Sequence, residues 1–174
     1  MLWSEQMRRR SVLALLGLAA PGLAACNLRP LHGGGAGAET NRELAAIMVE
    51  TPRSRVGQIL RNQLLDELNP AGLTVPSVYR LIVRLDRERD ALAIQLDDTV
   101  TRYDLTLLAR FELRRKADGV TLYQGAARRV ASYNVVRAPY ATLVAEQDAE
   151  RRAARELSQE IRARLAVQLA GKPA

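Results

Sequence analysis

The segment from Arg102 to Arg114 alternates between polar and apolar side chains at every position except Leu108. Its apolar positions are Tyr103, Leu105, Leu107, Ala109, Phe111 and Leu113. A period of two places all six on one face of an extended strand and leaves the charged residues on the other face. The chain is therefore expected to contain a sheet that buries one face and exposes a polar one.

Further strands are predicted on both sides of this segment, over residues 44–49, 79–85 and 120–133. Leu92, Ile94 and Leu96 extend the hairpin that joins the 79–85 strand to the alternating segment. Asp118-Gly119 predicts a tight turn before the last strand, because an Asp-Gly pair readily adopts the positive φ angles of a hairpin turn.

Two other segments have the spacing of amphipathic helices, with an apolar residue every three or four positions. The first follows Ser54, a helix-capping residue, and ends at Asn69-Pro70. The second follows Pro139 and ends at Gly171. The apolar positions are Val56, Ile59, Leu60, Leu64 and Leu68 in the first, and Ala149, Ala153, Leu157, Ile161, Leu165 and Leu169 in the second. The second helix also has the pairs Asp148/Arg152 and Glu160/Arg164 at ion-pair spacing.

These elements predict an α/β domain with two helices packed on one face of a small, mostly antiparallel sheet. This is the simplest arrangement that buries both helix stripes and the apolar face of the sheet. The opposite face stays polar and carries Arg80, Arg84, Arg102, Arg110, Glu112 and Arg114. That basic face is expected to need water or a partner.

The first 25 residues are organised like an export signal. A basic cluster, Arg8 to Arg10, precedes a short apolar stretch and a run of small residues. The apolar stretch is shorter than the about 20 residues that a membrane span requires. Either Met1 or Met7 is the start of the chain, and Arg9-Arg10 leaves a twin-arginine export route open.

Cys26 is the only cysteine and directly follows Leu23-Ala24-Ala25. The four residues resemble the lipobox of bacterial lipoproteins. The resemblance implies that the Cys26 thiol carries a diacylglyceryl group and that cleavage before Cys26 exposes an amino terminus that is then acylated. The alternative is a buried cysteine that happens to follow alanines. A metal site is not expected, because the chain has no second cysteine and only one histidine, His32.

The predicted organisation is a leader over residues 1–25, a lipidated cysteine with a flexible tether over 26–43, and one domain over 44–171. The tether is predicted from the glycine-rich run Gly33–Ala38. The whole chain has a formal charge of +7, and without the leader's three arginines and one glutamate the charge is +5. An exported lipoprotein does not meet nucleic acid, so the expected anionic partner is lipid.

The mature chain resembles the alphaproteobacterial LptE family of lipopolysaccharide-assembly lipoproteins. The start "CNLRPLHGG" is similar to the family's cysteine-aromatic-Arg-Pro-Leu-Tyr-Gly motif, with Leu28 and His32 standing where aromatic residues are usual. The other similar segments are Gln58 to Asn62, Thr101 to Tyr103, Ala131 to Asn134, Tyr140-Ala141 and Glu146 to Ala149. They extend over essentially the whole mature chain in the family's order.

The resemblance implies an outer-membrane lipoprotein on the periplasmic side, in a complex with the LptD β-barrel. It implies a role as plug and assembly factor for lipopolysaccharide transport, with an α/β fold and no cofactor. Asn27, in place of aspartate, resembles a sorting signal that permits delivery to the outer membrane.

Binding of lipopolysaccharide phosphates requires cations, and arginine binds phosphate through two parallel hydrogen bonds. The candidates lie at predicted strand ends and turns: Arg87, Arg89, Arg114, Arg115, Lys116, Arg128 and Arg129. The alternative for each is a solvated charge that keeps an exposed strand from pairing with other chains.

An enzyme is not expected. Asp97-Asp98 could form a carboxylate pair, but adjacent side chains of a strand diverge, which favours a place in a loop. No Gly-x-Ser-x-Gly, phosphate loop or metal spacing is present. Two other functions remain open: a lipoprotein auxiliary of a phospholipid-transport complex, and an envelope scaffold without lipid cargo.

We predict that the mature protein begins at Cys26 and that its sulfur carries a diacylglyceryl group. Mass spectrometry of protein purified from membranes measures this directly. A full-length polypeptide with a free thiol, recovered from the cytosol, would contradict the prediction.

Overall fold

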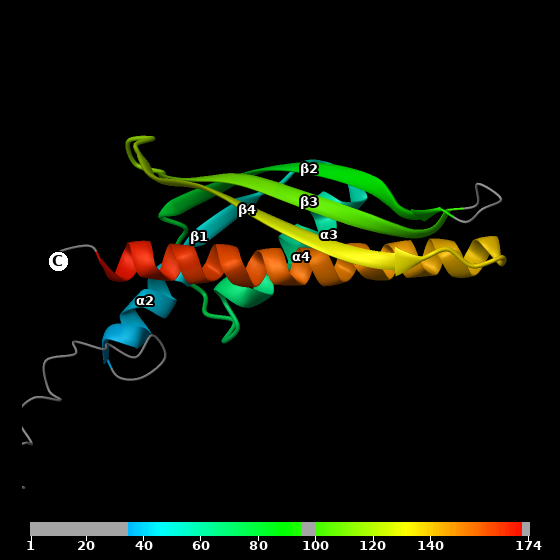
Figure 1. Cartoon of the computed structure of the whole chain (residues 1–174). Coiled ribbons are helices and arrows are strands. Elements are labelled where there is room, and N and C mark those ends of the chain that lie inside the picture. The colour runs from blue at the N-terminus through cyan, green and yellow to red at the C-terminus, as the bar shows by residue number, and fades with distance from the viewer. Residues whose placement is uncertain (1–34, 95–99, 172–174) are drawn as a thin grey trace, which may run out of the picture.

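The computed structural model describes residues 35–94 and 100–171 as three helices and a four-stranded sheet (Figure 1). In chain order the elements are α2 (Gly35–Ala45), β1 (Ile47–Glu50), α3 (Arg55–Leu68), β2 (Tyr79–Ile94), β3 (Val100–Arg115), β4 (Thr121–Asn134) and α4 (Pro139–Ala170). The long helix α4 runs beneath the sheet along its whole length. The predicted α/β fold class is confirmed.

The strands lie in the sheet in chain order, β1-β2-β3-β4. β1 pairs with the start of β2 in parallel, while β2 with β3 and β3 with β4 are antiparallel. The parallel pair is possible because α3 lies between β1 and β2 in the chain and returns it to the same end of the sheet. The sheet is thus mostly antiparallel, as predicted.

The apolar alternation of β3 forms the centre of the core. Leu105, Leu107, Ala109 and Leu113 have no exposed surface, and Phe111 is buried beside them. These side chains face α4, whose six predicted stripe residues are all buried as well. The core therefore lies between the sheet and the helices, where the alternating apolar residues of β3 pack against the apolar stripe of α4.

The predicted ends of the helices are confirmed. The Ser54 side chain accepts a hydrogen bond of 3.1 Å from the main-chain nitrogen of Gly57, which caps α3. α4 ends at Ala170 and is capped by Gly171, and Gly119 has a φ of 71° in the turn between β3 and β4. On α4, Arg152 pairs with Asp148 and Arg164 pairs with Glu160.

The prediction of a flexible tether is wrong for residues 35–43, because Gly35–Ala45 is a helix. Helix α2 packs against α4. Arg162 of α4 holds this corner together, since its guanidinium donates 2.9 Å to the main-chain oxygen of Glu67 and 3.4 Å to Asn41 Oδ1. Tertiary contacts therefore outweigh the low helix propensity of the glycines.

Two smaller differences concern strand ends. Leu44 and Ala45 belong to α2, so the first strand begins at Ile47, not at residue 44. β2 continues to Ile94, which confirms the extension of the hairpin as far as that residue, while Leu96 and Asp97-Asp98 lie outside the described residues. Among the described helices, none is both long enough and apolar enough to cross a membrane.

We predict that Leu157→Ala, in the buried stripe of α4, lowers the free energy of unfolding by about 2–5 kcal/mol, because it leaves a cavity in the core. The matched control Val167→Ala, on the same helix but 64% exposed, costs about 0.5 kcal/mol or less. Chemical denaturation of the two variants measures the difference. Equal losses would show that α4 does not pack as described.

Candidate functional site

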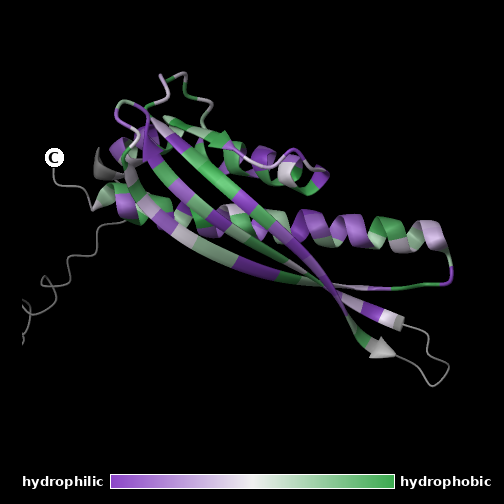
Figure 2. Cartoon of the chain, turned by 90° about the horizontal axis from the view of Figure 1, so that it is seen from above, coloured by the Kyte–Doolittle hydropathy of each residue, from purple (hydrophilic) through white to green (hydrophobic). Residues whose placement is uncertain are grey.

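The face of the sheet turned away from α4 is rich in arginine. Because side chains alternate across a strand, the even-numbered residues of the three long strands lie on this outer face, which Figure 2 views from above. Its arginines are Arg80, Arg84, Arg102, Arg110, Arg114 and Arg128. We call these six the outer-face arginines.

Two pairs of outer-face arginines stand directly opposite each other. Arg80 is the register partner of Arg114, and Arg84 is the register partner of Arg110. Like charges in opposed positions of a sheet destabilise it. Holding these arginines close together therefore costs free energy, and a bound anionic ligand would offset that cost.

Carboxylates neutralise only some of the outer-face arginines. Arg110 pairs with Asp86, Arg114 Nη2 lies 2.6 Å from Glu112 Oε2, and Arg80 Nε lies 3.4 Å from Glu50 Oε1.

In the described part of the chain, Arg84, Arg102 and Arg128 have no carboxylate within ion-pair distance. Arg128 instead donates a 3.2 Å hydrogen bond to Thr106 Oγ1. These three are the cations best able to bind an external anion.

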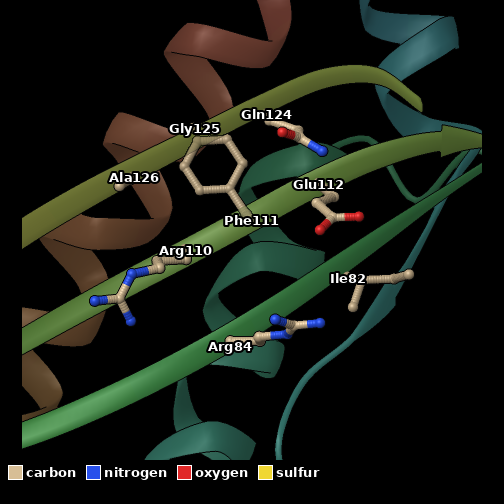
Figure 3. A pocket seen from close by; sticks show the side chains of 8 residues that line it. All are labelled: Ile82, Arg84, Arg110, Phe111, Glu112, Gln124, Gly125 and Ala126. Carbon is tan, nitrogen blue, oxygen red and sulfur yellow. The ribbon is translucent and has the colours of Figure 1, made fainter.

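A depression of about 340 Å³ lies among the outer-face arginines (Figure 3). Arg84 and Arg110 stand together at one end of it, and Glu112 with Gln124 stands toward the other. Gly125 leaves room for the Phe111 ring, since a Cβ there would lie 2.8 Å from Cζ of Phe111. Its full lining is Ile82, Arg84, Arg110, Phe111, Glu112, Gln124, Gly125 and Ala126.

Arg87 and Arg89 lie on the opposite, helix-facing side of the sheet. Arg87 Nε donates a 3.0 Å hydrogen bond to Oε1 of Glu150, which is 5% exposed, and Arg87 also pairs with Glu146. Arg55 of α3 contacts the second oxygen of Glu150. Glu150 thus joins α4 to both α3 and β2.

Arg89 packs in the same region, with its guanidinium carbon 4.7 Å from the centre of the Tyr103 ring. Interaction with the Tyr133 hydroxyl raises the pKa of Arg89 above its ordinary value, so the group stays charged. Tyr103 and Tyr133 stack at 5.7 Å between ring centres. Arg89 is therefore held by aromatic side chains of β3 and β4.

The remaining sequence candidates also have partners. Arg115 Nη1 lies 2.9 Å from Asp118 Oδ2, Lys116 Nζ donates 2.7 Å to Ser77 Oγ, and Arg129 Nη1 lies 2.6 Å from Glu160 Oε2. The seven candidates therefore do not form one cluster. Arg87, Arg89 and Arg129 face the helices, Arg114, Arg115 and Lys116 surround the hairpin turn, and only Arg114 and Arg128 belong to the outer-face arginines.

The sequence candidates omitted Arg84 and Arg102, although both were placed on the polar face. The alternation of β2 and β3 was the available signal, since it puts these residues in line with Arg110 and Arg114. Their lack of acidic partners could not be read from spacing. Within the described residues, no three His, Cys, Asp or Glu side chains are grouped to hold a metal ion.

Comparison with known proteins places this architecture in a family. The family model LptE, described as lipopolysaccharide-assembly, matches residues 43–165. A crystal structure of a Caulobacter crescentus protein assigned as a lipoprotein is 31% identical, with a TM-score of 0.67. The match covers 78% of this chain and 99% of that one. The comparison with curated proteins gives no match.

Two more distant solved structures share the fold. A minor lipoprotein of Acinetobacter baumannii is 18% identical with a TM-score of 0.56, over 71% of this chain and 91% of that chain. A lipoprotein B of Nitrosomonas europaea is 14% identical with a TM-score of 0.54, over 72% of this chain and 84% of that chain.

We predict that Glu150→Gln lowers the free energy of unfolding by about 1.5–3 kcal/mol, because it removes the charge that receives Arg55 and Arg87. Asp148→Asn serves as control, since it also removes a carboxylate bound to two arginines of α4, but one that is 52% exposed. The control is expected to lose less than about 1 kcal/mol. Comparable losses in denaturant titrations would refute the special role of Glu150.

Proposed function

The chain belongs to the LptE family of lipopolysaccharide-assembly proteins, and we propose that it acts as a plug and assembly factor bound to the LptD β-barrel. Family membership places the protein in lipopolysaccharide assembly as a non-enzymatic lipoprotein. The barrel partner and the plug role are the proposed part. They are supported by a narrow, two-layer body in which one face of the sheet is free of helices (Figure 1).

The outer-face arginines supply the chemistry that this role needs. Lipid A carries phosphates, and guanidinium groups bind phosphate through charge-assisted hydrogen bonds. Arg84 and Arg128 are exposed and have no carboxylate partner among the described residues. We infer that the outer face, and not the helix layer, meets the lipopolysaccharide. The opposed pair of Arg84 and Arg110 is the observation that carries this assignment.

Anchoring at the outer membrane is the second proposed element. Acylated Cys26 would hold the protein at the periplasmic side of that membrane, because two or more acyl chains suffice for stable attachment. The described part of the structure begins at Gly35, close behind Cys26 in the chain. The domain would therefore work next to the membrane surface.

We predict that the tagged wild-type protein, purified from its own outer membrane, brings down an LptD-type barrel in near-equal amount. Mass spectrometry of the eluate identifies the partner. Recovery of an inner-membrane phospholipid transporter instead would favour the auxiliary role, and recovery of no partner or lipid would favour a scaffold.

The double variant Arg84→Ala/Arg128→Ala is expected to bind lipopolysaccharide at least about tenfold more weakly, since each lost charged hydrogen bond costs about 1.5–3 kcal/mol. The control is Arg115→Ala/Lys116→Ala, which removes the same charge from side chains that have partners near the turn. Titration of the mature protein in detergent with labelled lipopolysaccharide compares them. A larger loss in the control would move the site to the hairpin turn.

A further inference from the structure

The two long edges of the sheet differ in how their main-chain groups are used. Lys116 donates its main-chain N–H to the oxygen of Val78, so these two residues form a hydrogen-bonded pair. Because such pairs recur at every second residue of an antiparallel ladder, the even-numbered residues of β2 hydrogen-bond to β3. The N–H and C=O groups of the odd-numbered residues point away from β3. β1 pairs with this side of β2 only as far as Ile82, and the chain then leaves the sheet toward α3 (Figure 1).

Beyond β1, the edge of β2 is open. Leu85, Arg87, Arg89 and Ala91 direct their main-chain groups to this edge, and no described residue hydrogen-bonds to them there. Residues 86–92 are all exposed. We call the segment from Leu85 to Ala91 the open edge.

The outer edge of β4, in contrast, is covered by guanidinium groups. Arg164 donates 2.8 Å to the main-chain oxygen of Ala126, and Arg152 of α4 donates 3.3 Å to that of Ser132. Arg129 donates 2.8 Å to the oxygen of Arg128 between them. Capped acceptors cannot receive a further strand, so this edge is protected from pairing. The same protection is missing on the open edge of β2.

Charge decides what kind of strand can pair with the open edge. Glu88 and Asp90 point to the outer face, and neither has an ion-pair partner in the described part of the chain. Asp90 also stands opposite Asp104 of β3, which concentrates negative charge there. A strand with basic side chains on its outer side would complement this position.

A second copy of this chain is a poor occupant. Antiparallel pairing of two open edges, in registers centred on residues 87 to 89, sets acidic residues among Asp86, Glu88 and Asp90 opposite each other on the outer face. An arginine, Arg87 or Arg89, then faces an arginine of the other copy on the opposite face. Such opposed like charges disfavour self-association through this edge.

We propose that the open edge is a docking site for an extended segment of the protein partner, which adds a strand beside β2 and carries basic side chains facing Glu88 and Asp90. Main-chain hydrogen bonds to Leu85, Arg87, Arg89 and Ala91 give affinity, and the acidic residues select the partner. The inference rests on the proposed function for the identity of that partner, an LptD-type barrel.

Amide hydrogen exchange at single-residue resolution tests the proposal on the mature wild-type protein, free and bound to the barrel. The amides of Leu85, Arg87, Arg89 and Ala91 are expected to exchange fast in the free protein and to become protected in the complex. Protection of these amides without the barrel, accompanied by a dimer in sedimentation, would assign the edge to a second copy and overturn the proposed partner.

Ala91→Pro removes one outward N–H from the open edge and breaks no hydrogen bond to β3. Proline is tolerated in a strand at such an edge position, where its missing N–H takes no part in the sheet. It is expected to weaken barrel binding at least about fivefold, because an acceptor of the partner stays unpaired. Val130→Pro removes an outward N–H from the capped edge of β4 and is expected to bind like wild type.

The outcomes separate the two claims. Failure of the wild-type protein to bind the barrel overturns the proposed function and the identity of the partner together. Barrel binding by the wild-type protein with no gain in amide protection, and with equal affinities for the two proline variants, overturns only the docking site. Should Ala91→Pro fail to fold, the exchange measurement on the wild-type protein decides alone.

Discussion

The apolar stripe of α4 lies against the inner face of the sheet, and this contact fixes which surfaces remain for function. Small residues allow α4 to approach the sheet closely, and Ala149, Ala153 and Ala154 are at most 1% exposed. Leu157, Ile161 and Leu165 fill the space beyond them with no exposed surface. Burial of these side chains supplies the main stabilising free energy, since each large apolar side chain contributes about 1.5–3 kcal/mol.

Once one face of the sheet is buried, strand geometry sorts every charged side chain of the three long strands. A shift of one residue in register would exchange the two faces, so the core fixes the register. Arg87, Arg89 and Arg129 then fall on the helix side, where carboxylates and aromatic rings hold them. The outer-face arginines fall on the free side, where only half have acidic partners among the described residues. The division between structural and available cations thus follows from packing.

Local patterns predicted much of the fold. The alternation of β3, the cap at Ser54 and the stripe of α4 are each complete within a short segment, and all three are found as expected. Helix α2 was missed because its glycines favour a tether, and its stability comes from contacts with α4 and Arg162 that are distant in the chain.

The same limit applies to the candidate site. Basic residues near strand ends were identifiable in the sequence, but their partners were not, since Glu146, Glu150 and Glu160 come from α4. Strand parity could have directed attention to Arg84, whereas its lack of a partner depends on the whole fold. The capped edge of β4 likewise depends on arginines that come from another element.

The most direct test of the central claim, that the outer face of the sheet meets lipopolysaccharide, is photocrosslinking in living cells. A benzophenone side chain in place of Gln124, which lines the outer-face depression, reports the molecule in contact with that face. The account predicts a crosslinked product that carries lipopolysaccharide. Crosslinks to phospholipid alone, or lipopolysaccharide adducts only from probes on the helix layer, would contradict it.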